Sequence, residues 1–96
     1  MTLRITRKKG SRTLKLEGRL VAEWAALLER ECSHLRRSRG AVNLDLEDVS
    51  FVDRAGIEAL DRLSRAGVAI HCRSGPVASV LEGEGVRVTR DVDGLR

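Results

Sequence analysis

The chain has 96 residues, of which 42% are hydrophobic and 33% are charged, and its two aromatic residues are Trp24 and Phe51. This length and balance indicate one ordinary soluble globular domain over residues 1–96 and exclude a disordered chain. No apolar run reaches the roughly 20 residues that cross a bilayer, and the start of the chain lacks a secretory pattern. With two widely spaced cysteines, Cys32 and Cys72, we expect a reduced, cytoplasmic protein without membrane insertion.

The net charge of +4 is concentrated near the start of the chain, where residues 1–19 carry seven lysines and arginines against Glu17 alone. Such a basic edge is typical of a surface that binds nucleic acid or anionic lipid. It is also typical of a hairpin and sheet edge that are kept soluble and unpaired. We favour the second interpretation, and we do not expect nucleic acid as a partner, because stacking aromatic residues are nearly absent.

The first part of the chain predicts a hairpin and then a helix. Apolar residues alternate over 3–5 and 14–16, which predicts two strands joined by a loop over 7–11, with Gly18 closing the second strand. From about residue 21 to 38, apolar residues recur at the spacing of a helix with one buried face.

The remainder predicts alternating strands and helices. Residues 42–46 alternate as a third strand, which we expect to end in a short acidic turn. A helix with a buried stripe follows over 57–66, and residues 68–70 predict a fourth strand. Pro76 is suited to open a third helix that ends at Gly83, and Val86 and Val88 predict a short fifth strand.

The order β-β-α-β-α-β-α-β predicts an α/β domain with a mixed, mostly parallel five-stranded sheet. Every strand is half polar, whereas parallel strands covered on both faces read as continuous apolar runs. We therefore expect two layers, with the helices mainly on one face of the sheet and the other face open. The open face is predicted to carry Thr13, Lys15, Asn43, Asp45, Ala69 and His71.

The chain shows no pattern of a catalytic or metal site. The cysteines and histidines form no CxxC, no HxxxH and no cluster at ligand spacing. Neither a G-x-S-x-G nucleophile motif nor a phosphate-binding glycine loop occurs. We therefore expect a protein that is not an enzyme and that holds no cofactor and no metal.

The segment from Asp53 to Gly56 has two interpretations. In the structural interpretation, Asp53 caps a helix by accepting amide hydrogen bonds, and Gly56 permits close approach of the backbone to a neighbour or an unhindered helix start. In the functional interpretation, the same turn is a docking point.

The segment resembles the STAS domain of anti-sigma factor antagonists and sulfate transporters. The resemblance depends on residues 44–46, on Val49-Ser50-Phe51-Val52-Asp53 and on Ala55-Gly56-Ile57 with the helix after them, which are similar to "LDLSxVxFIDSSGL". The order of elements from Leu3 to about Val88 agrees with that family. The resemblance implies the two-layer STAS-like fold.

In the phosphorylatable members of this family, a kinase that is itself the anti-sigma factor modifies the serine immediately before the glycine. Asp53 and Gly56 match the family's turn, but Arg54 replaces its first serine and Ala55 replaces the acceptor. Ala55 is therefore a lost phosphoacceptor position, and Ser50, in the same region, does not match that position.

The resemblance implies a non-enzymatic regulatory domain that binds a kinase-type anti-sigma factor or a related protein without a phosphoryl switch at position 55. The expected partner-binding residues are Asp53, Arg54, Ala55, Gly56, Ile57 and Glu58. We expect Gly56→Arg or Ile57→Asp to abolish partner capture and to leave the domain folded.

Two alternatives stay open. One is the small STAS subunit of a bacterial phospholipid-transport ABC complex, which would bind the ATPase through the same turn and helix. The other, from a different class, is a basic module that binds a nucleotide, a lipid or nucleic acid through its first 19 residues.

Overall fold

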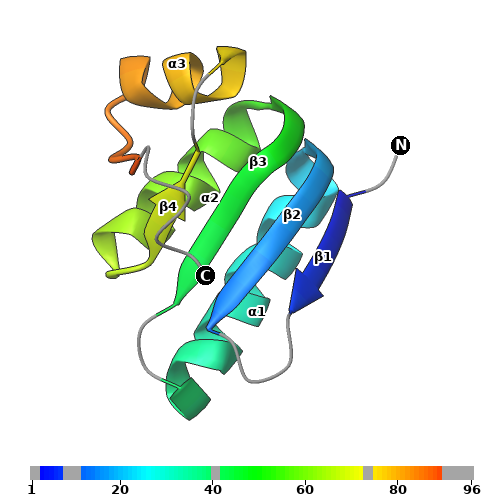
Figure 1. The fold of residues 1–96 in the computed structure, drawn as a ribbon, viewed down its shortest axis with the longest axis vertical. Coiled ribbons are helices and arrows are strands. Elements are labelled where there is room, and N and C mark those ends of the chain that lie inside the picture. Colours follow the sequence, from blue (N-terminus) through cyan, green and yellow to red (C-terminus); the bar gives the residue numbers. More distant parts are fainter. Residues whose placement is uncertain (1–2, 8–11, 40–41, 73–74, 90–96) are drawn as a thin grey trace.

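The computed structural model describes residues 3–7, 12–39, 42–72 and 75–89, in which strands and helices alternate (Figure 1). The elements are β1 (Leu3–Arg7), β2 (Thr13–Leu20), α1 (Ala22–Arg39), β3 (Asn43–Val52), α2 (Arg54–Arg65), β4 (Ala69–His71) and α3 (Pro76–Gly83). The strands form one four-stranded sheet in the order β1-β2-β3-β4. β1 and β2 are antiparallel, and the pairs β2–β3 and β3–β4 are parallel. The predicted mixed, mostly parallel sheet is confirmed.

The helices α1 and α2 lie side by side against one face of this sheet, α1 behind β1 and β2 and α2 behind β3 and β4 (Figure 1). α3 lies across the end of the sheet at which β2, β3 and α2's first turn meet. The core between the two layers is aliphatic, because strand residues that face the helices alternate with polar ones. Its fully buried large side chains are Leu16, Leu20, Leu28, Leu44, Leu46, Leu60, Ile70 and Leu81.

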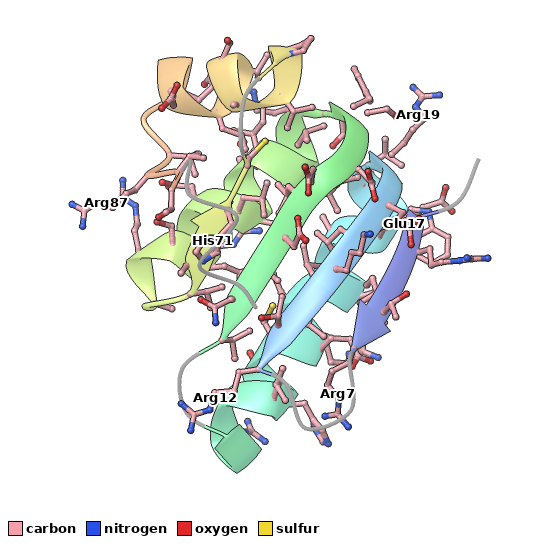
Figure 2. All side chains as sticks on the ribbon, in the orientation of Figure 1. Arg7, Arg12, Glu17, Arg19, His71 and Arg87 are labelled. Carbon is pink, nitrogen blue, oxygen red and sulfur yellow. The ribbon has the colours of Figure 1, made fainter. Side chains whose placement is uncertain are left out.

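The opposite face of the sheet is polar and open, as predicted. On it the Lys15 ammonium lies 3.0 Å from the Asp48 carboxylate, and the ring Nε2 of His71 lies 3.1 Å from Oδ1 of Asn43. Lys15 is exposed, while Asn43, Asp45 and His71 are half-buried. Side chains of this face are visible in front of the ribbon in Figure 2.

The number of strands and two strand ends differ from the prediction. β2 does not close at Gly18, which has a φ of 104° inside the strand, but continues to Leu20. β3 does not end in an acidic turn after Leu46 but continues to Val52. Two register shifts against β2 insert one extra β3 residue each, so the segment remains a strand although its alternation breaks.

The predicted fifth strand over Val86 and Val88 is replaced, within the described residues, by one isolated bridge between His71 and Thr89. The Val86 amide donates to the Leu81 carbonyl in the turn that ends α3, with Gly85 at a φ of 84°. That amide is therefore used by the helix end and is not available to a sheet ladder.

Both cysteines are buried thiols that are not joined in a disulfide, Cys32 in α1 and Cys72 after β4. Among the helices of the described residues, none is both long and apolar enough to cross a membrane.

Candidate functional site

Asp53 joins three elements at the end of the sheet where α2 begins. It is the N-cap residue of α2, and its Oδ1 accepts a hydrogen bond of 2.8 Å from the Gly56 amide. Its Oδ2 accepts a bond of 3.0 Å from the amide of Ala22 in the first turn of α1. Its own amide donates to the Leu20 carbonyl at the end of β2. The predicted cap is confirmed, and one carboxylate fixes the starts of both large helices.

Gly56 is buried in the narrowest contact of this junction. A Cβ at this position would lie 2.7 Å from the backbone oxygen of Leu20 and 2.7 Å from Cγ1 of Val52. Gly56 does not have a positive φ, in contrast to four other glycines of the described chain. The need for glycine is therefore one of space, which confirms the predicted close approach of the backbone to a neighbour.

The first turn of α2 presents three of the predicted partner-binding residues at the surface. Arg54 and Glu58 are exposed, and Ala55 is half-buried. Nη1 of Arg54 lies 2.9 Å from Oε1 of Glu84, directly after α3. Because this pair is solvated, it adds little stability, but it connects the first turn of α2 to the end of α3.

Gly56 and Ile57 do not share this exposure. Both are buried, Ile57 with 8% of its surface exposed, and Ile57 packs in the hydrophobic core. The expectation that Gly56→Arg or Ile57→Asp would leave the domain folded is therefore wrong. An arginine would collide with the backbone of Leu20, and a carboxylate would enter the core without a partner. These two residues support the turn from its buried side, whereas Arg54 and Glu58 are exposed and Ala55 is half-buried.

A phosphoacceptor is absent from the turn because neither Arg54 nor Ala55 has a hydroxyl. Ser50 lies on β3, where its Oγ donates a 3.2 Å hydrogen bond to the Gly18 carbonyl across the strand pair. Ser50 thus belongs to the strand that leads to the turn and not to the turn itself.

Next to the turn lies an apolar feature that the sequence did not predict. Phe51 and Val80 are the exposed large hydrophobic residues of the described chain, and both line one small groove between β3 and α3. The guanidinium of Arg19 lies 4.8 Å from the centre of the Phe51 ring. Phe51 is the single phenylalanine of the chain and stands two residues before Asp53. This position beside the turn was the only sequence feature that could have drawn attention to Phe51. Its place beside Val80 depends on how α3 packs across the end of β3, and no local sequence pattern predicts that packing.

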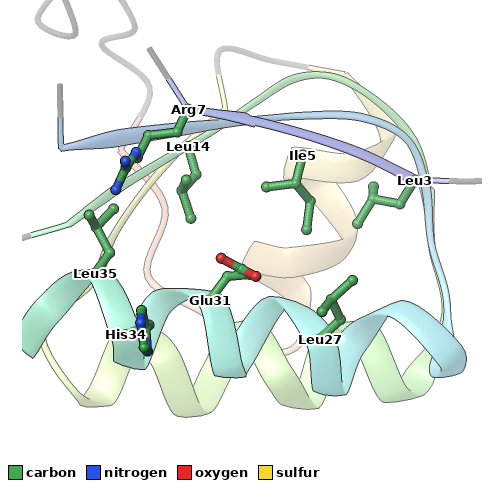
Figure 3. Close-up of a pocket in the computed structure, with 8 residues that line it drawn as sticks. All are labelled: Leu3, Ile5, Arg7, Leu14, Leu27, Glu31, His34 and Leu35. Carbon is green, nitrogen blue, oxygen red and sulfur yellow. The ribbon is translucent and has the colours of Figure 1, made fainter. Parts of the chain in front are cut away.

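A larger groove of about 540 Å³ lies between β1 and α1 (Figure 3). Leu3, Ile5 and Leu14 point from the sheet toward the helix, and Glu31 points from the helix toward the sheet. Leu3 and Leu14 are already buried, whereas Glu31 and Arg7 are exposed at the opening. Charged side chains thus dominate what the groove presents to solvent, unlike the mostly apolar lining typical of small-molecule sites.

Two cations of the described chain have raised pKa values, and both are structural. On the open face, the hydrogen bond from Lys15 to Asp48 and the negative charge of Asp48 raise the pKa of Lys15 above its ordinary value of 10.5. A hydrogen bond to Glu29, with its charge, raises the pKa of Arg62 and joins α1 to α2. Both groups are solvent-exposed partners of carboxylates far from the Asp53 turn, so neither marks a reactive centre. Within the described ranges, no three His, Cys, Asp or Glu residues gather as metal ligands do.

Two solved structures with a similar fold are those of anti-sigma factor antagonists. The structure of an anti-sigma factor antagonist from Mycobacterium paratuberculosis matches 98% of this chain and 89% of its own, with a TM-score of 0.75 and 16% identity. The anti-sigma factor antagonist SpoIIAA in its unphosphorylated form matches 97% of this chain and 92% of its own, with a TM-score of 0.62 and 14% identity.

No protein-family model and no curated protein matches the chain by sequence. At identities this low, the structural likeness concerns the fold. The chain has the STAS-like fold of the anti-sigma factor antagonists over nearly its whole length, which confirms the predicted resemblance.

Proposed function

We propose that this chain is a non-enzymatic regulatory domain that binds a kinase-type anti-sigma factor, or a related protein, through the first turn of α2 and without phosphorylation at position 55. The observation that carries the proposal is the construction of that turn. Asp53 and the buried Gly56 hold it rigidly, while Arg54 and Glu58 are exposed and Ala55 is half-buried. A preorganised, exposed turn on a fold of antagonists is suited to protein recognition.

The charge of the turn supports a partner with an acidic group. The N-terminus of a helix carries the positive end of its dipole, and the first turn of α2 has no acidic residue of its own. Arg54 adds a cation at the same place, although it shares its charge with Glu84. A carboxylate of the partner placed near the Arg54 side chain would meet a favourable field.

The lost acceptor changes the regulation that this turn can have. A phosphoserine at a helix N-terminus adds nearly two negative charges and forms strong hydrogen bonds, and is therefore a strong local switch. Ala55 offers no oxygen for phosphoryl transfer. We infer that the complex persists in ATP and that its lifetime is set by partner concentration or by the partner's own state.

The test uses the whole chain and each purified kinase-type anti-sigma factor encoded in the source genome. Binding is measured by calorimetry with ADP and again with ATP. We expect one of these kinases to bind in both nucleotides, and the charge reversal Arg54→Glu to weaken binding about tenfold or more. Arg37→Glu, an exposed reversal on α1, is the matched control and should bind as the unaltered chain does.

The Ala55→Ser variant examines the missing switch directly. Mass spectrometry should detect phosphate on Ser at position 55 in the presence of the bound kinase and ATP, and the complex should then dissociate. Lack of binding by every kinase of this type would refute the proposal. Binding to the ATPase of a phospholipid ABC transporter in its place would assign the chain to that other class of complex.

A further inference from the structure

The two exposed large hydrophobic residues of the described chain meet in one place. Phe51 at the end of β3 is 43% exposed, and Val80 on α3 is 45% exposed. Single exposed apolar residues are common on protein surfaces and need no explanation. Here they come from segments about 30 residues apart and line the same groove, so they form one apolar site, which we call the Phe51–Val80 notch.

The notch has the size of one side chain. Its volume is about 90 Å³, and it is lined by Ser50, Phe51, Val52, Pro76, Val77 and Val80. A cavity that holds benzene is larger, at about 150 Å³. The space therefore suits the branched end of an aliphatic side chain better than an aromatic ring.

Arg19 adds a charge at the edge of the notch. Its guanidinium lies over the Phe51 ring, and no carboxylate within the described part of the chain pairs with it. Figure 2 places Arg19 at the same end of the sheet as α3. Stacking on the Phe51 ring holds the Arg19 guanidinium in place, and its N–H groups can still donate hydrogen bonds to a carboxylate. Arginine and aromatic residues in a desolvated pocket are typical of the residues that dominate protein interfaces.

The notch continues into the turn of the proposed function. Val80 and Glu84 stand four residues apart, and the Glu84 amide donates to the Val80 carbonyl, so both lie on one side of α3's end. Glu84 in turn binds Arg54 at the start of α2. The end of α3 thus links the notch to Arg54, through Val80 on one side and Glu84 on the other.

We propose that the Phe51–Val80 notch is the anchor site for the same partner, receiving one aliphatic side chain of that protein with an adjacent carboxylate bound to Arg19. The inference deepens the proposed function, on which it rests, by naming what the partner must present. The apolar lining of the notch favours an aliphatic side chain, and the Arg19 guanidinium beside it favours an acidic residue next to that side chain. α2's first turn then fixes the orientation of the docked protein.

The test repeats the calorimetric titrations of the anti-sigma kinases with Phe51→Ser, Val80→Ser and Arg19→Gln. We expect each of the two serine variants to weaken binding about tenfold or more. Arg19→Gln should weaken binding by a smaller factor and reduce its dependence on salt concentration. Circular dichroism and thermal unfolding establish that each variant is folded.

The matched controls lie elsewhere on the molecule. Ile5→Ser removes an aliphatic side chain from the groove between β1 and α1, and Arg37→Gln removes an exposed cation from α1. Both should leave kinase binding unchanged. Equal weakening by Ile5→Ser and by Phe51→Ser would overturn the assignment of the anchor to the notch.

The remaining outcomes separate the two proposals. If Arg54→Glu abolishes kinase binding while Phe51→Ser and Val80→Ser leave it unchanged, the notch proposal fails and the proposed function stands. If no kinase binds the unaltered chain, the proposed function fails and the notch proposal fails with it. Sedimentation that shows a dimer of this chain, dissociated by Phe51→Ser, would overturn the assignment to another protein and make the notch a self-association site.

Discussion

Replacing Gly56 by alanine examines the packing that holds the candidate site. The added Cβ would lie 2.7 Å from the Leu20 oxygen and 2.7 Å from Cγ1 of Val52, and 3.1 Å from Cγ of Leu20. The first contact is the serious one, because it is made by backbone that is hydrogen-bonded to the Asp53 amide. Relief requires the start of α2 to move away from the ends of β2 and β3.

The expected magnitude is a balance of two effects. Overpacking a buried site costs about 1–3 kcal/mol. Alanine offsets part of this loss, because it is preferred over glycine in helices by about 1 kcal/mol. Because two of the contacts are at 2.7 Å, the overpacking cost lies in the upper part of its range, and we expect Gly56→Ala to lower the free energy of unfolding by about 1–2 kcal/mol. In a domain of this size, each kcal/mol lowers the Tm by about 4–8 °C.

Gly83→Ala is the matched control within the same chain. Gly83 is the last residue of α3, has no positive φ, and would place its Cβ where nothing lies within 4 Å. The same substitution should there be neutral or stabilising by up to about 1 kcal/mol. Urea unfolding, followed by circular dichroism and by the fluorescence of the single Trp24, measures both variants.

Two results would refute this reasoning. One is a Gly56→Ala variant as stable as the unaltered chain with an unchanged dependence on urea. The other is an equal loss of stability in Gly83→Ala, which would show that the loss does not come from the close contacts at Gly56.

Three further predictions concern the junction, the open face and the core. Asp53→Ala removes an acceptor from two backbone amides and should lower the free energy of unfolding by about 2 kcal/mol in urea, whereas an unchanged midpoint would contradict the capping role. NMR titration should find the pKa of Lys15 above 10.5, and lower in Asp48→Asn; the contribution of the pair is present at neutral pH and is lost as pH rises through that raised pKa. Cys32 and Cys72 are buried thiols that are not joined in a disulfide, so a thiol reagent should modify them only at the rate at which the protein opens, and rapid reaction without urea would contradict their burial.

The helices and the cap of α2 were predictable because their signals are local. A 3.6-residue period marks the buried stripe of α2, and its C-terminal Gly67 adopts the positive φ that ends a helix. Asp53 stands three residues before the amide that it caps, so the hydrogen bond could be expected from spacing alone. Gly56 also suggested close approach, but the neighbour that it approaches comes from β2, 36 residues earlier.

The second half of β3 was not predictable for a specific reason. Leu46, Val49 and Val52 face the core at a spacing of three residues, because each register shift against β2 adds one residue. A spacing of three is not the period of a strand, so the segment read as a turn. At Val86 the error was the opposite one, because a strand was predicted where none forms. Val86 and Val88 alternate with polar neighbours as in a strand, but the Val86 amide donates to the Leu81 carbonyl at the end of α3.

The site was predictable in position but not in its surface. The turn was found from its resemblance to a known motif, and from that motif all six residues from Asp53 to Glu58 were expected to contact a partner. The fold, however, buries Gly56 and Ile57 and exposes Arg54 and Glu58. The notch could not be found at all, because it depends on α3 crossing the end of β3. Such a crossing is a property of tertiary packing and leaves no mark in the spacing of either segment.

The bulges of β3 connect the fold to the proposed function. By adding two residues, they bury Val49 and expose Ser50 and Phe51 together, directly before Val52 and the cap of α2. In an unbroken strand with Leu44 and Leu46 facing the helices, position 50 would face inward with position 52, and Phe51 would be the single outward residue between them. Irregular pairing therefore adds Ser50 to the exposed residues beside the turn. On the proposed function, Ser50 and Phe51 then form the β3 wall of the notch, in a docking surface whose phosphoryl switch Ala55 has removed.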